Sequence, residues 1–129
     1  MPKKFLIADD SDAKAMLLEG IIHAAKFSAT ILRARTTEEA MCIIEKQPDI
    51  AFAFVDYEIP TKEGPAVIRF LKEKNPLAHI ALVSAVENDA YKNSALAAGA
   101  ETYVCTSFDM QTVEDTLHNI LQSWSTAKA

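Results

Sequence analysis

The feature that most constrains the fold of this chain is a set of five short apolar runs separated by segments of helix length. The runs cover residues 5–8, 29–32, 50–55, 80–83 and 102–105. All but the last lack the alternation of apolar and polar residues that marks a strand with one solvent-exposed face. Unbroken apolar runs are typical of strands that are covered on both faces. Parallel strands need long crossovers, and helices fit between these runs. The sequence therefore predicts one α/β domain, with a parallel sheet between two layers of helices.

Apolar residues recur at helical spacing in the first and last of the predicted helices. We expect each set to form one face that is buried against the sheet. The two sets are Ala13, Met16, Leu17, Gly20, Ile21 and Ala24 in the first helix, and Val113, Leu117, Ile120, Leu121 and Trp124 in the last.

Three helix ends carry recognisable signals. Thr36 and Glu39 have the spacing of a capping box, in which the hydroxyl and the carboxylate each cap a backbone N–H. Gly99 follows two alanines and suits the positive φ of a helix C-terminal cap. Asp109 precedes the last helix and is expected to be its N-cap.

Length and charge narrow the class of protein. The 129 residues suit a single domain, expected over 1–129 with its core at about 3–124, and the net charge of −5 gives no support for nucleic-acid binding. No apolar run is long enough for a membrane span, and the N-terminus lacks the features of a signal peptide, so we expect a cytoplasmic protein. Cys42 and Cys105 stand far apart and are expected to be buried, reduced thiols.

Acidic residues follow two of the predicted strands. Asp9 and Asp10 end the first, Asp56 ends the third, and Ser84 ends the fourth. Ligands of open α/β sheets bind beyond the carboxyl ends of the strands, and in a sheet of order 2-1-3-4-5 the first and third strands are neighbours. Three crowded carboxylates repel one another, and a Mg²⁺ ion, which prefers oxygen ligands, resolves this repulsion. An acidic pair alone also fits a helix cap, so the whole combination carries the prediction of a metal site.

Several segments together resemble the receiver domains of two-component response regulators, over nearly the whole chain. The matching segments are residues 5–10 (FLIADD), 48–50 (PDI), 56–60 (DYEIP) with Gly64, 83–85 (VSA) and 95–103 (ALAAGAETY). The resemblance implies a flavodoxin-like (βα)5 three-layer sandwich with a parallel five-stranded sheet of order 2-1-3-4-5. It also implies a signalling module of a phosphorelay rather than an enzyme.

The resemblance assigns roles to individual residues. Asp9, Asp10 and Asp56 match ligands of Mg²⁺, together with the backbone carbonyl of Glu58. Asp56 matches the acceptor of a phosphoryl group from a sensor histidine kinase or a phosphotransfer protein. Ser84 matches the hydroxyl residue that binds the phosphoryl group in the family.

Ser84 and Tyr103 match the switch pair of the family. Movement of that pair changes which output partner binds the face made by helix four, strand five and helix five. A half-buried aromatic in the fifth strand would look identical to Tyr103 in the sequence.

The chain departs from the family pattern after the fifth strand, where receivers carry a Lys-Pro pair and this sequence has Thr106 and Ser107. Three carboxylates and Mg²⁺ sum to −1, and a phosphorylated Asp56 brings the sum to about −2, which a lysine would return to −1. Allowing for relaxation and solvent, we expect the missing charge to cost about 1–3 kcal/mol of phosphorylation-driven switching. Lys62, in the loop after Asp56, is the substitute cation nearest in sequence, although the pattern favours a solvated loop lysine at that position.

Two other functions remain open from the sequence. A pseudo-receiver that binds a protein partner without phosphorylation is favoured by Thr106 and opposed by the intact Asp9, Asp10, Asp56 and Ser84. A phosphatase or phosphotransferase with an Asp nucleophile is less favoured, because its acid/base residue two positions on is an Asp where this chain has Glu58. The three glycines form no phosphate-binding loop.

Overall fold

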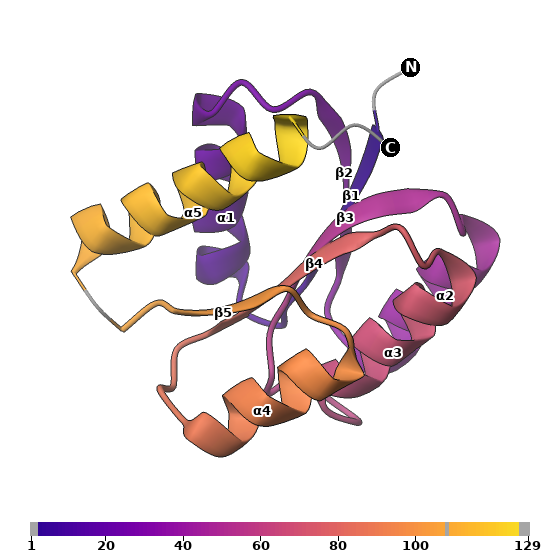
Figure 1. The fold of residues 1–129 in the computed structure, drawn as a ribbon. Coiled ribbons are helices and arrows are strands. Elements are labelled where there is room, and N and C mark those ends of the chain that lie inside the picture. The colour runs from indigo at the N-terminus through magenta and orange to yellow at the C-terminus, as the bar shows by residue number, and fades with distance from the viewer. Residues whose placement is uncertain (1–2, 108, 127–129) are drawn as a thin grey trace.

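The computed structural model describes residues 3–107 and 109–126, in which strands and helices alternate along the chain (Figure 1). The elements in order are β1 (Lys3–Ala8), α1 (Asp12–Ala24), β2 (Ala29–Ala34), α2 (Thr37–Lys46), β3 (Ile50–Val55), α3 (Gly64–Lys74), β4 (His79–Ser84), α4 (Asp89–Ala98), β5 (Thr102–Cys105) and α5 (Met110–Thr126).

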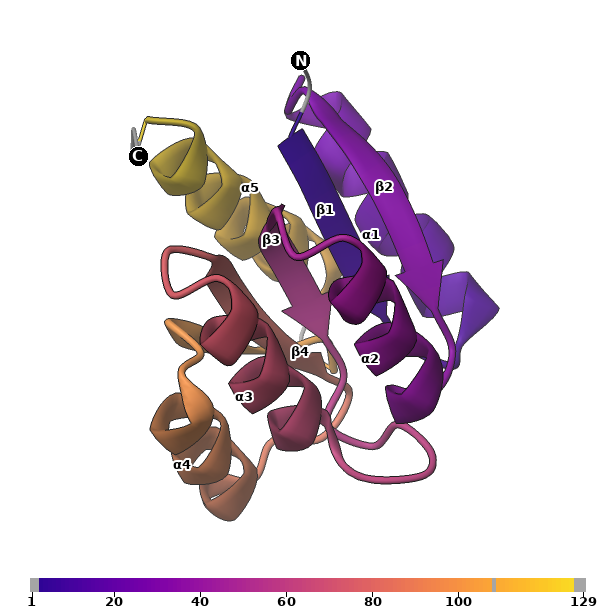
Figure 2. The same cartoon turned by 90° about the vertical axis from the view of Figure 1, so that its right-hand side faces the viewer.

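The five strands pair in parallel in the order β2-β1-β3-β4-β5. Helices α1 and α5 cover one face of this sheet and helices α2, α3 and α4 the other, as the two views show (Figures 1 and 2). This is the flavodoxin-like three-layer sandwich that the sequence predicts. The strand order makes β1 and β3 neighbours, so the residues that follow them meet at one edge of the sheet.

Alternate residues of the central strands enter two separate cores. Phe5 and Phe54 pack with α1 and α5 on one face, whereas Leu6 and Val55 pack with α2 and α3 on the other. All four of these side chains are at most 1% exposed. Burial on both faces is the physical reason why the strands have no alternation of polar and apolar residues.

The predicted apolar face of α1 is wrong. Met16 is 71% exposed, and the face that packs on the sheet consists of Ala15, Leu18, Ile21 and Ile22. The helix is apolar around most of its circumference, so spacing alone selects two faces. The structure selects the face that leaves Lys14, in the first turn, directed at the carboxyl edge of the sheet, where it contacts Asp9 and Asp56. In α5 the predicted face is confirmed, with Val113, Leu117, Leu121 and Trp124 buried and Ile120 half-buried.

The prediction of two buried cysteines is half wrong. Cys105 is buried at the end of β5, but Cys42 is exposed on α2. The buried residues of α2 are Thr37, Ala40 and Ile44, which follow the helical repeat. Cys42 lies two residues from Ala40, so it projects from the opposite side of the helix.

The predicted helix ends are confirmed, with one change. The Thr36 hydroxyl accepts a hydrogen bond from the N–H of Glu39 at 3.0 Å, but the Glu39 carboxylate accepts from the N–H of Arg35 rather than from that of Thr36. Gly99 has φ +121°, which favours glycine, and the Asp109 carboxylate accepts from the N–H of Thr112 at 3.1 Å. Among the described helices, none combines the length and the apolar character that crossing a membrane requires.

Candidate functional site

Three carboxylates meet at the carboxyl edge of the sheet. One carboxylate oxygen from each of Asp9, Asp10 and Asp56 lies within 4.8 Å of the other two. The backbone fixes this convergence, because the N–H of Asp9 donates to the carbonyl of Ala34, and the N–H of Asp56 donates to that of Ala8, each at 2.9 Å. The strand ladder thus continues past the strand ends and aligns the two aspartates. The structure brings together the three acidic residues that the sequence singles out.

Asp9 is almost fully enclosed, with 1% of its surface exposed. Its Oδ1 accepts a hydrogen bond from the N–H of Ser11 at 2.9 Å, and its backbone carbonyl accepts from the guanidinium of Arg33 at 2.7 Å. Its Oδ2 makes no hydrogen bond with any described residue. A buried carboxylate oxygen without a donor is costly unless a cation compensates it.

Lys14 supplies a cation to this cluster. Its Nζ lies 2.9 Å from Asp9 Oδ2 and 3.0 Å from Asp56 Oδ1, and the side chain is 12% exposed. Toward Asp56 the ammonium donates a hydrogen bond. Toward Asp9 Oδ2 the separation is short but the direction does not suit a hydrogen bond, so that contact is one of charge.

The sequence reasoning missed Lys14, although one signal pointed to it. The side chain of Ser11 caps the N–H of Lys14, which places the lysine in the first turn of α1. The N-terminal end of a helix carries partial positive charge, so a lysine there is unfavourable unless an anion lies nearby. That misplaced charge, just after an acidic pair, could have identified the contact.

The substitute cation considered in the sequence, Lys62, does not fill this role. Its backbone N–H donates to the Thr37 hydroxyl at 3.1 Å, which ties the loop after β3 to the start of α2. Lys62 itself is exposed, and none of the ion pairs found among the described residues includes it. A side chain from α1, rather than one from the β3–α3 loop, reaches the carboxylates.

Asp56 is the carboxylate whose protonation the site perturbs most clearly. Burial raises the pKa of Asp56 above its ordinary value of 3.8, and the neighbouring charges of Asp9 and Asp10 raise it further. The ammonium of Lys14 opposes this shift. Because burial is the largest cause, the charged form of Asp56 is less favourable in the folded protein than in water.

Ser84 and Thr106 lie side by side at the ends of β4 and β5. The Ser84 side chain is 1% exposed and accepts a hydrogen bond from the N–H of Val86 at 3.1 Å. The N–H of Thr106 donates to the Ser84 carbonyl at 2.8 Å. Tyr103 is half-buried on β5, and its hydroxyl donates to the carbonyl of Val86. The loop after β4 thus joins the two residues predicted as a switch pair.

The loop after β3 is linked to α4 by a contact between two tyrosine rings. The rings of Tyr57 and Tyr91 are stacked with their centroids 3.7 Å apart. The Tyr91 hydroxyl donates to the Glu58 side chain, and the Tyr57 hydroxyl donates to Glu63, each at 3.2 Å. The side chain of Glu58 is therefore directed toward α4, and the metal-ligand role of its backbone carbonyl stays a prediction.

The residues of the cluster fit a hard divalent cation. The candidate ligands are all carboxylate oxygens, which Mg²⁺ prefers, and Asp9 also has a buried Oδ2 that accepts no hydrogen bond from a described residue. Such an ion would be held by Asp9, Asp10 and Asp56. Lys14 contacts carboxylate oxygens of two of the same residues, Asp9 and Asp56.

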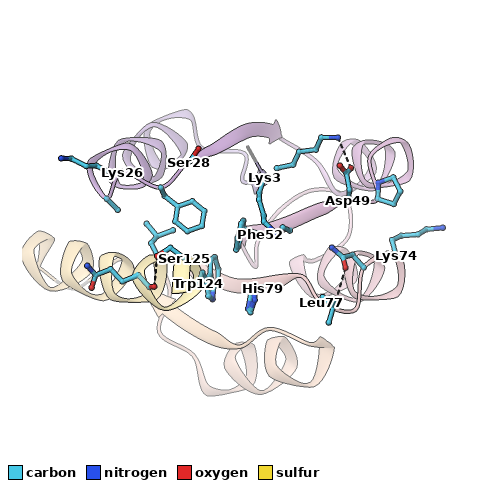
Figure 3. A pocket seen from close by; sticks show the side chains of 18 residues that line it. Lys3, Lys26, Ser28, Asp49, Phe52, Lys74, Leu77, His79, Trp124 and Ser125 are labelled. Atoms are coloured by element: carbon cyan, nitrogen blue, oxygen red, sulfur yellow. Dashed lines mark hydrogen bonds and ion pairs between the residues drawn. The ribbon is translucent and has the colours of Figure 1, made fainter. Parts of the chain in front are cut away.

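A wide hollow of about 1070 Å³ lies at the opposite end of the sheet, where the strands begin (Figure 3). Lys3, Phe52, Lys74, His79 and Trp124 are among its lining residues. Phe52 and Trp124 are 6% and 3% exposed, so the aromatic floor is closed and offers little surface to a ligand. The acidic cluster does not contribute to this hollow.

The comparison with known proteins agrees with this geometry. Residues 5–118 match the response regulator receiver domain family. The chain belongs to this family. Phosphorylation on an aspartate, binding of Mg²⁺ in an acidic pocket, and exchange with histidine kinases or phosphotransfer proteins are general properties of receiver domains, which are signalling modules rather than enzymes of the ordinary kind.

Related receiver proteins cover nearly the whole chain. The chemotaxis protein CheY of Halobacterium salinarum is 26% identical over 121 residues, which cover 94% of this chain and 98% of that protein. CheY of Thermotoga maritima is 28% identical over 120 residues, or 93% of this chain and 98% of that protein.

Solved structures share the fold of this receiver domain at lower identity. The phosphorylated cyanobacterial phytochrome response regulator RcpA superposes with a TM-score of 0.85 at 16% identity, covering 100% of this chain and 98% of that one. The Mn²⁺-bound form of the response regulator Rcp1 gives 0.83 at 18% identity, covering 99% and 98%.

Proposed function

We propose that this receiver domain accepts a phosphoryl group on Asp56 from a histidine kinase or a phosphotransfer protein, in a reaction that depends on Mg²⁺. The observation that carries the proposal is the convergence of Asp9, Asp10 and Asp56 within 4.8 Å. The RcpA structure, described as phosphorylated, and the Mn²⁺-bound Rcp1 structure support both parts of it by analogy.

The residues of the chain divide the chemistry among them. An Asp56 carboxylate oxygen attacks phosphorus, the P–N bond of the donor phosphohistidine breaks, and its electron pair leaves with the imidazole nitrogen. Asp9, Asp10 and Asp56, with the backbone carbonyl of Glu58, would hold the cation. When bound, Mg²⁺ supplies positive charge that stabilises the phosphoryl oxygens during the transfer.

Switching follows from the position of Ser84. In the proposal its hydroxyl turns from the N–H of Val86 toward the phosphoryl group, which releases the loop that also receives the Tyr103 hydroxyl. Tyr103 then changes its packing, and the face formed by α4, β5 and α5 exchanges output partners. Thr106 has a neutral hydroxyl in place of an ammonium, so this position makes no charge-assisted bond to the phosphoryl group.

The experiment is a titration of the ¹⁵N-labelled protein with Mg²⁺ and then beryllofluoride, a mimic of the phosphoryl group, followed by amide NMR. We expect Mg²⁺ to shift the amides of residues 9–11 and 56–58. Beryllofluoride then shifts those of Ser84, Val86 and Tyr103. Asp56→Asn is the matched variant, which keeps the side-chain shape and must lose the beryllofluoride response.

A second function is favoured by Thr106, which carries no charge where the family has a lysine. A receiver that binds its partner without phosphorylation would show shifts confined to the metal site. Beryllofluoride would then leave Ser84 and Tyr103 unchanged in the wild type. In that outcome the phosphoacceptor proposal fails and the binding module remains.

A further inference from the structure

The acidic cleft contains a cation, the ammonium of Lys14, that is not part of the family pattern. Lys14 Nζ lies within 3.0 Å of oxygens of both Asp9 and Asp56, and its side chain is 12% exposed. Asp9 Oδ2 has no hydrogen-bond donor among the described residues, so this ammonium is the group that compensates it. The lysine is therefore part of the cleft.

Lys14 also restores the charge that Thr106 removes. Three carboxylates, Mg²⁺ and one lysine sum to zero, since −3 + 2 + 1 = 0. A phosphorylated Asp56 brings the sum to about −1. This equals the balance of a receiver with its lysine after strand five. The Thr106 hydroxyl lies 3.4 Å from the carbonyl of Ser84 and carries no charge, so α1 and not β5 supplies the cation.

We propose that Lys14 is the resident counter-cation of the acidic cleft, which Mg²⁺ displaces from Asp9 and Asp56 and which then serves the phosphoryl group in place of a lysine after β5. The inference rests on the proposed phosphoacceptor function of the same cleft. Lysine suits this role because a compact ammonium on a four-carbon stem can move between neighbouring anions while it stays tethered.

Two opposite effects follow from removing the ammonium. Without its competitor, Mg²⁺ binds more tightly to the three carboxylates. Without its counter-charge, the phosphoryl mimic binds more weakly at saturating Mg²⁺. A loss of structure in α1 would instead weaken the binding of both Mg²⁺ and the phosphoryl mimic. Opposite changes in the two affinities therefore distinguish the proposed role from a structural one.

The test compares Lys14→Met with Lys62→Met, which removes the same unit of charge from a side chain outside the cleft, so that the net charge becomes −5 − 1 = −6 in both. Mg²⁺ affinity is measured by calorimetry on protein stripped with EDTA. The beryllofluoride midpoint is measured by NMR at saturating Mg²⁺. Lys14→Arg, which keeps the charge, is the conservative variant, and far-UV circular dichroism checks the fold of each variant.

In Lys14→Met we expect Mg²⁺ binding about tenfold tighter and beryllofluoride binding about tenfold weaker. A tenfold change corresponds to the interaction energy of one partly screened pair of charges at short range. Lys62→Met should change each by less than about twofold, because exposed charges are screened within about 8–10 Å. Lys14→Arg should stay near the wild type.

Three results overturn the inference: Mg²⁺ binding in Lys14→Met that is no tighter than in Lys62→Met, no binding of Mg²⁺ by the wild type, or, where the wild type responds to beryllofluoride, a midpoint in Lys14→Met that equals that of Lys62→Met. Failure of the proposed function is a separate result, in which the wild type does not respond to beryllofluoride. The Mg²⁺ comparison alone then decides the role of Lys14. If only Lys14→Met binds Mg²⁺, the lysine blocks the cleft and is not displaced by the cation, so the inference falls, as it also does if neither protein binds Mg²⁺.

Discussion

Several charged residues at the carboxyl edge of the sheet lie in positions that are unfavourable for their charge. Lys14 lies in the first turn of α1, where the helix dipole disfavours a cation by about 0.3–1 kcal/mol. Asp9 is buried, and Asp56 is 9% exposed, although charged groups favour water. The charges of Lys14 and the two aspartates compensate one another, which is typical of a functional cluster.

Asp56 makes the stability of the metal-free protein depend on pH. Its pKa is raised in the folded state, so the folded protein binds this proton more tightly than the unfolded chain does. Stability is therefore lost as the pH rises from about the ordinary value of 3.8 to the raised value, and is lower above that window. We expect Asp56→Asn, which cannot titrate, to become more stable relative to the wild type across this window. Urea unfolding in EDTA at a series of pH values measures the difference, and parallel profiles would contradict it.

Gly64 is required by the close approach of α3 to the backbone of Asp56. A Cβ at this position would lie 2.1 Å from the carbonyl oxygen of Asp56, which the backbone cannot accommodate without moving. We expect Gly64→Ala to lower the free energy of unfolding by about 1–3 kcal/mol, as overpacking does. Gly20→Ala is the control, because nothing lies within 4 Å of its added carbon, and it should raise helix stability by up to about 1 kcal/mol. Urea unfolding of both variants at pH 7 checks the contrast.

At the scale of elements, the strands were predictable and the orientation of α1 was not. The strands β1, β3 and β4 are largely buried on both faces, so each is a short apolar run whose length favours a strand over a helix. Helix α1 has apolar residues on nearly every side. The helical repeat therefore allows two apolar faces, one that includes Met16 and Leu17 and one that includes Leu18 and Ile22. The buried face is the one that packs with α5 and the sheet, and it also directs Lys14 toward Asp9 and Asp56. Local spacing carries no information on these distant contacts.

The orientation of α1 can be tested by two truncations on the same helix. Leu18 is 1% exposed in the core with α5, and Leu18→Ala should cost about 2–5 kcal/mol of unfolding free energy. Met16 is 71% exposed, and Met16→Ala should stay within about 0.5 kcal/mol of the wild type. Chemical denaturation ranks the two, and a reversed order would mean that the face expected from the sequence is the buried one.

At the scale of the whole molecule, the topology determines which residues can act together. The order β2-β1-β3-β4-β5 brings Asp9 beside Asp56 and places Ser84 and Thr106 at the ends of the next two strands, β4 and β5. Because strand ends follow from the apolar runs, the three aspartates of the site could be predicted. The cation could not, because it comes from the first turn of a helix and depends on how that helix is rotated.

Lys14 and position 106 should be energetically coupled across the sheet edge. Thr106→Lys alone adds a charge that the cleft already has, so we expect a small change in the beryllofluoride midpoint. In the Lys14→Met background the same substitution should recover most of the lost affinity, giving a coupling on the order of 1 kcal/mol or more. A double-mutant cycle of these midpoints, measured by NMR, gives the coupling. Additive effects of the two substitutions would show that the lysines act independently.

The distance between the two ends of the sheet has a practical consequence for optical work. The single tryptophan, Trp124, stacks on Phe52 beside the hollow where the strands begin, whereas Tyr57 directly follows Asp56. Indole emission will therefore follow unfolding of the C-terminal helix and remain blind to ions at the aspartates. Tyrosine emission, or a tryptophan introduced as Tyr57→Trp, gives a signal from the end of the molecule where the charges meet.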